Sequence, residues 1–529
     1  MGEFAGNNRT KQNKLIILFQ EVLSHDYYIA TSTFEWFPGV EIHHSRDLVN
    51  WRTLTRVLTT EAQVSLRGNG SSGSIWAPAL SYHDGLYYLL YTDVKSRQSV
   101  YKDLHNYLIT SENLLGPWSQ PVRLNGSGFD PFLFHDEDGR KWLLNMRWDF
   151  RKQHSSFSGI VMQEYDPHTG KLTGPIHELY HGTPTGVTEG PQLYRRGGYY
   201  YLLVAEGGTG VNHMVTLARS RTLTGPYETD PDFPIMTTAH DLTYPFQQAG
   251  HGSLVETQSG EWYMAHLCTR PIPGTATLNP LGRETAIQRC EWTEDGWLRL
   301  AHGGKLPALE VEGPDLPLHP FPAVPGRDEF DRDQLGAPYQ SLRVPIEPDW
   351  ASLSERPGYL RLRGRESLAS NFDQSLVGRP IQHFACEIST CLEFAPEHFM
   401  QMAGLALYYD DKDYYYLRVT ADELRGPCLG VVMCRGGQYD ELTSMQISVR
   451  TWERYYLKAA IQGRELVFSA SPDGITWTAV CTPLDFGTLS DEYGGKLGFT
   501  GSYACLCAQD LDQQALPAYF AYFEYKALS

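Results

Sequence analysis

Two acidic residues that precede similar strands could act together on one substrate. Asp130 lies in FDPFL and Glu189 in EGPQL, and each motif leads into a strand rich in aromatic and β-branched residues. If both carboxyl groups reach one cavity, one can protonate a departing oxygen while another assists the attack, which is the chemistry that cleaves a glycosidic bond. A neighbouring ionised Asp and burial beside aromatic rings would both raise the pKa of Glu189, so Glu189 suits the proton-donor role.

The strands that must position these residues belong to a repeat. Similar segments recur about every 50–60 residues, the length of a four-stranded propeller blade. They are HDYYIATST, DGLYYLLYTD, GRKWLLNMRWD, GGYYYLLVAEGG and GEWYMAHL. Five repeats predict a five-bladed β-propeller over residues 26–302, with a first strand that could begin near residue 15. A large β-sandwich would also show many short strands, but the even spacing favours the propeller.

A short segment precedes each repeated strand at a similar distance. Counting back nine positions from the strand aromatic reaches Pro78, Pro191 and Ser253, and a longer count of eleven reaches Pro131. Because inner strands surround one axis in a propeller, the residues just before these positions should converge on one cavity. They are Trp76, Ala77, Phe129, Asp130, Glu189, Gly190, His251 and Gly252. Taken singly, an Asp before Pro more often fixes a turn, and a lone His or Trp more often belongs to a core. Their placement at equivalent positions of the repeat favours a binding or catalytic site.

Composition narrows the function classes. Lys+Arg of 44 against Asp+Glu of 62 gives a formal net charge of −18, which argues against nucleic acid and anionic membranes as partners and suits neutral ligands. All nine cysteines follow residue 267 with no CxxC pair, so we expect neither a zinc site nor a disulfide scaffold. No Ser-His-Asp arrangement with a nucleophile elbow is present.

The first 25 residues are atypical. In MGEFAGNNRTKQNKLIILFQ a few basic residues precede LIILF, but five apolar residues make a short signal-peptide core and no small-residue cleavage site follows. We therefore expect a cytoplasmic protein. The GEF near the start resembles a cloning scar, which leads to the hypothesis that residues 1–25 are not native.

The second half of the chain predicts a separate β domain. Residues 303–327 contain six prolines and no periodicity, as expected of a stiff linker. From residue 328 to 529, segments such as AGLALYYDD, RYYLKAAIQ and YFAYFEYKAL alternate with period two and indicate a β-sandwich. Taken alone, this domain could be a carbohydrate-binding module.

Several blocks together resemble glycoside hydrolase family 43, in particular its two-domain β-xylosidases. The blocks are DYYIATSTFEWFPGVEIHHSRDLVNW, IWAPALSYHDGLYYLLYTDV, SGFDPFLFHDEDGRKWLLNMRWD, TEGPQLYRRGGYYYLLVAEGGT, AGHGSLV and PLGRETAIQR, and the resemblance extends from about residue 26 onward. It implies an inverting exo-acting enzyme that releases xylose from the non-reducing ends of xylo-oligosaccharides, with α-L-arabinofuranosidase side activity also open. Xylo-oligosaccharides, xylose and arabinose are the implied ligands, a homo-oligomer is expected, and no cofactor is required.

The resemblance also implies residue roles. By motif, Glu189 matches the family's general acid and Asp130 matches the Asp that tunes its pKa. The residues that match the family's pocket walls are Phe34, Trp76, Ala77 and Phe129. His251 matches the histidine beneath the sugar, and Arg283 matches an arginine that binds sugar hydroxyls. A loop of the concanavalin-like sandwich closes the pocket in such enzymes, and its match FTGSY points to Tyr503. Related sandwiches sometimes hold calcium, but AYFAYFEY lacks the aspartates, so no metal is predicted.

The general base is where this sequence departs from the family. The family's Asp stands ten residues before the first strand tyrosine, a position that Ile17 occupies. Glu21 and Asp26 are the nearest acids, and neither is in register. Loss of a positioned base costs about 10²–10⁴-fold in rate, so we expect impaired turnover. The alternative is a non-catalytic carbohydrate-binding pseudoenzyme on the same scaffold.

Overall fold

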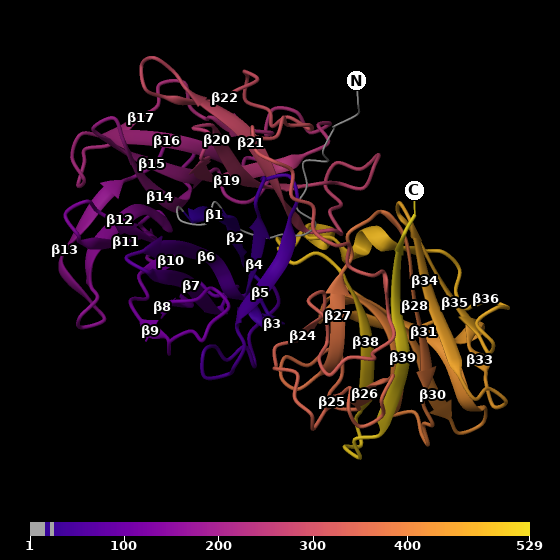
Figure 1. The fold of residues 1–529 in the computed structure, drawn as a ribbon. Coiled ribbons are helices and arrows are strands. Elements are labelled where there is room, and N and C mark those ends of the chain that lie inside the picture. Colours follow the sequence, from indigo (N-terminus) through magenta and orange to yellow (C-terminus); the bar gives the residue numbers. More distant parts are fainter. Residues whose placement is uncertain (1–15, 22–25, 529) are drawn as a thin grey trace.

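The chain folds into two β domains that lie side by side (Figure 1). The computed structural model describes residues 16–21 and 26–528. Residues up to about 300 form five sheets around a central axis, and residues from about 327 form two larger sheets. The predicted five-bladed β-propeller and concanavalin-like β-sandwich are therefore confirmed.

Each propeller blade is an antiparallel sheet whose strands follow chain order. Blade one contains β1 (Ile16–Glu21), β2 (Asp26–Thr31), β4 (Gly39–Ser45) and β5 (Arg52–Leu58). Blade two contains β6 (Ser74–His83), β7 (Leu86–Ser96), β8 (Lys102–Ser111) and β9 (Val122–Arg123). Blade three contains β10 (Gly128–His135), β11 (Lys141–Trp148), β12 (Phe157–Asp166) and β13 (Lys171–Tyr180). Blade four contains β14 (Thr188–Arg196), β15 (Tyr199–Glu206), β16 (Met214–Ser220), β17 (Glu228–Thr229) and β18 (Met236–Thr237), and blade five contains β19 (Gln247–Glu256), β20 (Trp262–Thr269), β21 (Arg283–Trp292) and β22 (Leu298–Leu300).

Packing between blades closes the ring. The inner strand β1 contacts both β6 and β19, so the first blade meets the last without exchanging a strand. Apolar clusters lie between neighbouring blades; one of them joins Leu90 of β7 to Leu133 of β10 and Leu143 of β11. Because both faces of a blade are covered, its strands read as continuous apolar runs such as LYYLLY rather than as alternating ones.

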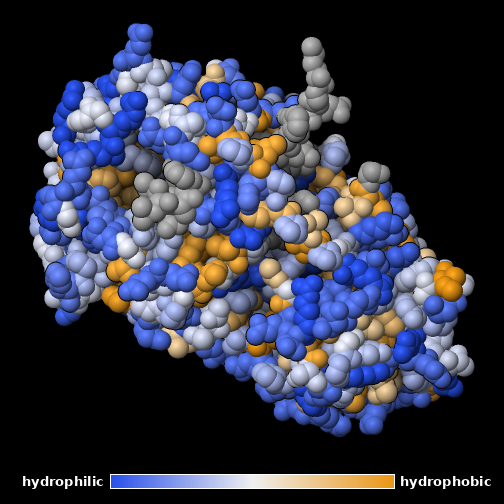
Figure 2. Space-filling view, in the orientation of Figure 1, coloured by the Kyte–Doolittle hydropathy of each residue, from blue (hydrophilic) through white to orange (hydrophobic). Residues whose placement is uncertain are grey.

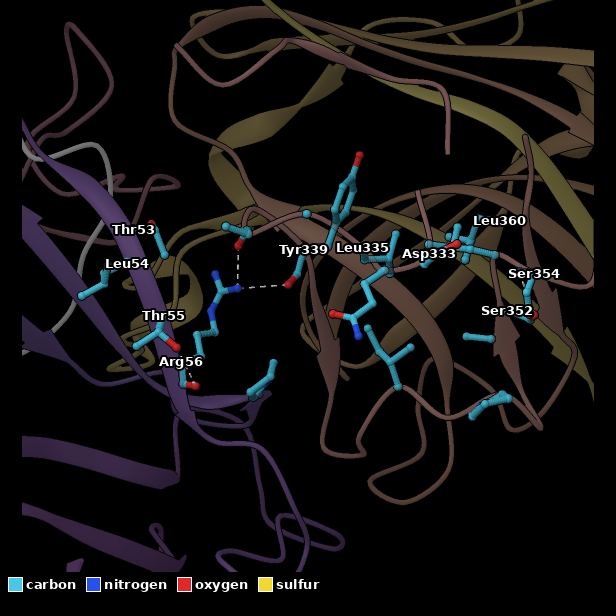
Figure 3. A pocket seen from close by; sticks show the side chains of 18 residues that line it. Thr53, Leu54, Thr55, Arg56, Asp333, Leu335, Tyr339, Ser352, Ser354 and Leu360 are labelled. Atoms are coloured by element: carbon cyan, nitrogen blue, oxygen red, sulfur yellow. Dashed lines mark hydrogen bonds between the residues drawn. The ribbon is translucent and has the colours of Figure 1, made fainter. Parts of the chain in front are cut away.

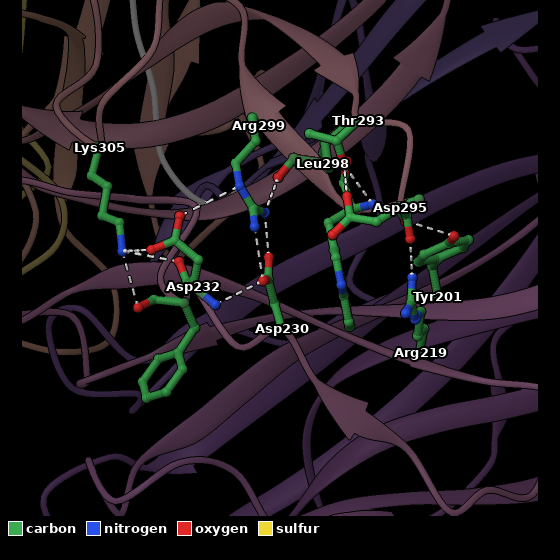
Figure 4. Close-up of polar contacts among 12 residues, drawn as sticks. Tyr201, Arg219, Asp230, Asp232, Thr293, Asp295, Leu298, Arg299 and Lys305 are labelled. Atoms are coloured by element: carbon green, nitrogen blue, oxygen red, sulfur yellow. Dashed lines mark hydrogen bonds and ion pairs between the residues drawn. The ribbon is translucent and has the colours of Figure 1, made fainter.

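Polar contacts add a seam between blades four and five (Figure 4). Arg299 of β22 donates to both carboxylate oxygens of Asp230, which follows β17. Lys305 donates to Asp232 Oδ1 at 3.0 Å, and Tyr201 OH donates to Gly296 O at 2.7 Å. These bonds hold the end of the propeller chain against its neighbouring blade.

The second domain is a sandwich of two antiparallel sheets over one large apolar core. One sheet contains β23 (Arg327–Asp328), β25 (Ala351–Ser352), β26 (Leu360–Arg363), β28 (Ala385–Glu393), β34 (Tyr455–Gln462), β35 (Glu465–Ser471), β36 (Thr478–Ala479), β37 (Leu484–Asp485) and β39 (Pro517–Ala527). The other contains β24 (Gln340–Leu342), β27 (Ser375–Pro380), β29 (Gln401–Asp410), β30 (Asp413–Asp422), β31 (Gly426–Arg435), β32 (Gln438–Glu441), β33 (Ile447–Ser448) and β38 (Tyr503–Asp510). Three short 3-10 helices are η1 (Thr443–Met445), η2 (Phe486–Leu489) and η3 (Tyr493–Gly495).

The two domains share a sheet edge. Strand β3 (Trp36–Phe37) belongs to the propeller sequence but pairs with β24 of the sandwich. Trp36 is fully buried there and stacks on Tyr503, with ring centroids 3.6 Å apart. This pairing ties the loop after β2 to the sandwich, so the second domain helps to set the geometry at the propeller axis.

A cavity of about 730 Å³ opens between the domains beside β5 (Figure 3). Arg56 crosses this boundary, with Nη1 donating to Ala337 O and to Tyr339 O. Asp333 is the cavity's one carboxylate among the described residues, so it offers no acid pair. Figure 2 shows that the visible face is mainly hydrophilic, with hydrophobic residues in separate patches.

Candidate active site

The inner strands of four blades carry β-bulges where the sequence predicted convergence. The pairing register shifts between Trp76 and Ala79, between Phe129 and Phe132, between Glu189 and Gln192, and between Gly250 and Ser253. Inside these bulges Asp130 and His251 have positive φ angles of 57° and 52°, which non-glycine residues seldom adopt. Bulges and strained backbone re-aim side chains and concentrate at functional sites.

Asp130 and Glu189 meet in one cavity of about 580 Å³. The backbone N–H of Gly190 donates to Asp130 Oδ2 at 3.0 Å, so the residue after Glu189 holds the carboxylate of the neighbouring blade. Gly190 also has a positive φ, and a Cβ there would lie 2.8 Å from the ring of His251. Only glycine lets the three blades approach this closely.

The two carboxyl groups have different surroundings. Burial raises the pKa of Glu189 from its ordinary 4.5 to about 7, with Arg283 acting in the opposite direction. Burial and the charge of Glu189 raise the pKa of Asp130 as well, while the Gly190 N–H favours its ionised form. Glu189 Oε1 is buried with no hydrogen-bond partner among the described residues. Burial alone would protonate either carboxyl group, so the hydrogen bonds distinguish them: the Gly190 N–H favours the negative charge on Asp130, which leaves a shared proton for Glu189.

Aromatic rings form part of the cavity wall. Trp76 and Phe129 line it, as predicted, with ring centroids 5.2 Å apart in an edge-to-face contact. Phe34, Ala77 and His251 are also buried, but lie behind this first layer, since the residues lining the cavity do not include them. The ring of His251 lies directly beside Gly190.

The sandwich contributes Phe499 rather than Tyr503 to the cavity. Phe499 lines the cavity with ring centroids 5.6 Å from Phe34 and 5.8 Å from Trp76. Its backbone N–H donates to Ser72 Oγ of the propeller at 3.1 Å, which fixes the loop. Tyr503 instead lies under Trp36 with 1% of its surface exposed and is not among the lining residues. The predicted loop is thus present, but its contact residue is four positions earlier.

Arg283 lies between the two domains. Its guanidinium carbon is 4.6 Å from the centroid of the Phe499 ring, and Nη2 donates to Thr209 O at 3.0 Å. Burial lowers the pKa of Arg283, whereas the charges of Asp491 and Glu492 from the sandwich raise it. Asp491 accepts hydrogen bonds from Tyr409 OH and Gly501 N at 2.8 and 3.2 Å. The sandwich therefore supplies two acidic side chains that act on this arginine.

Sequence reasoning missed a further group of lining residues. They are Arg97, Gln98, Lys102, Trp148, Phe157, Val187, Gly208, Thr209, Gly210, Lys496 and Leu497. Many of those from the propeller lie in or beside the loop that follows the second strand of a blade. In an antiparallel meander this loop lies at the same end of the blade as the start of the inner strand. The segments SRQSVYK, DFRKQHSSF and GGTGVNH could have been identified from this rule.

The first blade differs from the other four. Strand β1 pairs with β2 without interruption from Ile16 to Glu21, and Ile17 lies opposite Ala30. Gln20 pairs with Tyr27, whereas Tyr82 pairs with Tyr87, so this hairpin is longer. Ile17 therefore occupies the rung held in blade two by Ala79, the first rung after the bulge. Counting a fixed number of residues back from the strand tyrosine does not account for this longer hairpin. The side chain of Ile17 and residues 1–15 lie outside the described part of the chain.

Asp26, the nearest acid whose side chain is described, does not line the cavity. Asp26 accepts bonds from His44 Nε2 at 2.9 Å and from Arg46 Nε at 2.8 Å, and is buried. Glu21 lies at the hairpin end of β1, opposite Asp26. Among the described side chains, Asp130 and Glu189 are the carboxylates that line the cavity. The same part of the chain contains no group of three or more His, Cys, Asp or Glu that could hold a metal ion.

Comparison with known families agrees with this geometry. The model of Glycosyl hydrolases family 43 matches residues 20–298, and that of the Beta xylosidase C-terminal Concanavalin A-like domain matches residues 327–526. The chain belongs to glycosyl hydrolases family 43. It is a glycosidase of this family, with an acid pair at the propeller axis and a sandwich that closes against it.

Relatives of this family 43 chain match it along nearly its whole length. The Beta-xylosidase of Bacillus subtilis (strain 168) is 45% identical, with 95% of this chain and 96% of the relative covered. The Xylan 1,3-beta-xylosidase of a Vibrio species is 44% identical, with 94% and 95% covered. The crystal structure of xylan beta-1,4-xylosidase from Bacillus halodurans C-125 is 51% identical, with a TM-score of 0.94 and coverage of 98% of this chain and 100% of that one. No helix among the described residues of the family 43 chain could span a membrane.

Proposed function

We propose that this family 43 chain binds the non-reducing end of β-1,4-linked xylo-oligosaccharides and releases xylose with inversion. The observation that carries the proposal is the meeting of Asp130 and Glu189 in one aromatic-walled cavity. Glu189 donates the proton to the departing oxygen because its pKa of about 7 keeps it protonated in mildly acidic solution. Asp130 stays ionised and stabilises the positive charge that develops on the sugar.

The cavity wall suits a pentose ring. Trp76, Phe129 and Phe499 present apolar faces, and Arg283 behind Phe499 supplies positive charge. The cavity volume of about 580 Å³ lies within the ~300–1,000 Å³ range of small-molecule sites. Related proteins named xylosidases of both 1,3 and 1,4 linkage support xylosides as the substrate class. Activity on α-L-arabinofuranosides, action in the cytoplasm and assembly into a homo-oligomer remain part of this proposal.

We further propose that the chain works without the usual general base. An inverting glycosidase needs a carboxylate on the face opposite the acid to activate water. The sequence holds only Glu3 and Glu21 as acids before Asp26. Without the base the rate should fall by about 10²–10⁴-fold, or about 3–5 kcal/mol in the barrier. The second candidate, a sugar-binding pseudoenzyme, is favoured by this same missing acid.

Hydrolysis of two aryl β-xylosides tests the acid assignment. With phenyl β-xyloside the departing oxygen needs a proton, whereas 2,4-dinitrophenolate leaves without one. The Glu189→Gln variant should therefore lose about 10²–10⁴-fold on the first substrate and much less on the second. Equal losses on both would contradict the role of Glu189. Xylose binding by calorimetry with no product after long incubation would favour the pseudoenzyme.

The Ile17→Asp variant tests the position of the missing base. The family count places the base at Ile17, so this variant should hydrolyse an aryl xyloside faster than the parent chain. Ile17 stands on the rung that Ala79 holds in blade two, just after the bulge of that blade. Comparable rates for the two proteins would show that the count or the mechanism is wrong. Ile17→Asn is the matched control without a charge.

A further inference from the structure

Two exposed aromatic side chains stand beside the cavity that contains Asp130 and Glu189. Tyr101 and Phe150 have 62% and 52% of their surfaces exposed, although apolar rings are usually covered. Their ring centroids are 5.0 Å apart, in an edge-to-face arrangement. The two residues belong to different blades, so they form one aromatic pair across a blade boundary.

This pair is continuous with the cavity wall. Tyr101 lies in the turn between β7 and β8; Arg97 and Gln98 of this turn line the cavity, and so does Lys102 at the start of β8. Phe150 follows Trp148, which also lines the cavity. Residues on both sides of the exposed pair therefore face the same hollow.

The pair is also held in place. Trp148 Nε1 donates to Val100 O at 2.7 Å, which links the Tyr101 turn to the end of β11. The ammonium of Lys102 lies 4.5 Å from the centroid of the Trp148 ring and donates to Arg97 O at 2.8 Å. Asp149 N donates to Ser156 O at 2.9 Å, which fixes the backbone beside Phe150. A fixed surface loses little conformational entropy when a ligand stacks on it.

Aromatic rings thus extend from the acid pair to solvent. Phe129 adjoins Asp130 and lies 6.3 Å from Trp148, centroid to centroid, while 4% of Phe129 is exposed. The exposed rings of Tyr101 and Phe150 belong to the two segments that the Trp148 Nε1–Val100 O bond joins. Pyranose rings carry apolar C–H faces that pack on aromatic rings, so a chain whose first sugar is at Asp130 would meet successive rings on its way out.

We propose that Tyr101 and Phe150 form a distal subsite for the third sugar of a linear β-linked xylo-oligosaccharide. The inference rests on the proposed function, because it takes the first sugar to lie at Asp130 and Glu189. The first sugar occupies the acid pair, the second lies against Trp148 and Phe157, and the third stacks on the exposed pair. A trisaccharide gains a contact that a disaccharide cannot make.

Calorimetric binding of xylobiose and xylotriose tests the subsite. All measurements use the Glu189→Gln background, so that the sugars remain uncleaved. We expect xylotriose to bind about fivefold to tenfold more tightly than xylobiose, the gain typical of one aromatic contact. Tyr101→Ala with Phe150→Ala should bring this ratio close to one and leave xylobiose binding unchanged. Tyr439→Ala, which removes a tyrosine of β32 that is also 62% exposed, is the matched control and should keep the ratio.

The outcomes separate this inference from the proposed function. Binding of xylobiose with a ratio of one in the parent, or an unchanged ratio in the double variant, would overturn the subsite alone. Failure of both sugars to bind would overturn the proposed function and the subsite with it. Sedimentation of the double variant provides a second reading: a changed oligomeric state with an unchanged ratio would show that the pair contacts another copy of the chain.

Discussion

Replacing Glu189 by glutamine should change how stability depends on pH. The folded protein holds the Glu189 proton up to a pH of about 7, whereas the unfolded chain releases it near 4.5. Between these values the folded state binds more protons than the unfolded state, so stability falls as pH rises. At 1.36 kcal/mol per pKa unit the full loss is about 3 kcal/mol, and most of it accumulates between pH 5 and pH 8.

Calorimetric melting of the parent and of Glu189→Gln at pH 5 and pH 8 measures this effect. Glutamine stays neutral, so the variant does not lose this stability as pH rises. The Tm of the variant minus that of the parent should therefore increase by about 5–10 °C from pH 5 to pH 8, the shift expected from about 3 kcal/mol in a propeller of this size. Glu112→Gln, an exposed site after β8, removes a carboxylate outside the cavity and should show no such gain. A Tm difference between Glu189→Gln and the parent that is equal at both pH values would refute the buried, protonated Glu189.

Three further changes test the contacts between the domains. Phe499→Ala should weaken xylose binding by about tenfold, the value of one aromatic contact, in calorimetry, with Phe399→Ala at an exposed site as control. Asp491→Asn should raise KM for an aryl xyloside more than it lowers kcat, and lower stability, because the buried Arg283 keeps Glu492 but loses the other acidic neighbour from the sandwich; unchanged KM would contradict this. Trp36→Ala should cost about 3–5 kcal/mol in urea unfolding, since the ring is fully buried against Tyr503, and a loss below 1 kcal/mol would contradict it.

The sequence alone predicted those features that repeat. The five blades share strand and turn patterns, so equivalent positions could be aligned, and Asp130 and Glu189 do meet where that alignment places them. The wall residues Trp76 and Phe129 followed from the same reasoning. Prediction from a repeat works because every blade buries a twisted sheet between two neighbouring blades in the same way.

Features that depend on contacts between unlike segments could not be predicted in the same way. Phe499 lies in a loop, and Tyr503 begins β38 four residues later. Tyr503 stacks on Trp36 and does not line the cavity, and this contact joins segments that are far apart in the sequence. The hairpin after β1 is longer than that of blade two and displaces Ile17 by two residues, which a fixed count cannot reveal. Arg97 and Lys102 lie in a connecting turn whose sequence shares no pattern with the other blades.

The most direct test of the central claim is the product formed from 2,4-dinitrophenyl β-xyloside in the presence of azide. An inverting site without a general base leaves the face opposite the aryl group open to a small anion that needs no deprotonation. We predict that azide accelerates the reaction and that nuclear magnetic resonance identifies α-xylosyl azide, whatever the register of β1. A rate independent of azide with α-xylose as the product would show that a base is present, and a β-configured product would contradict inversion at this site.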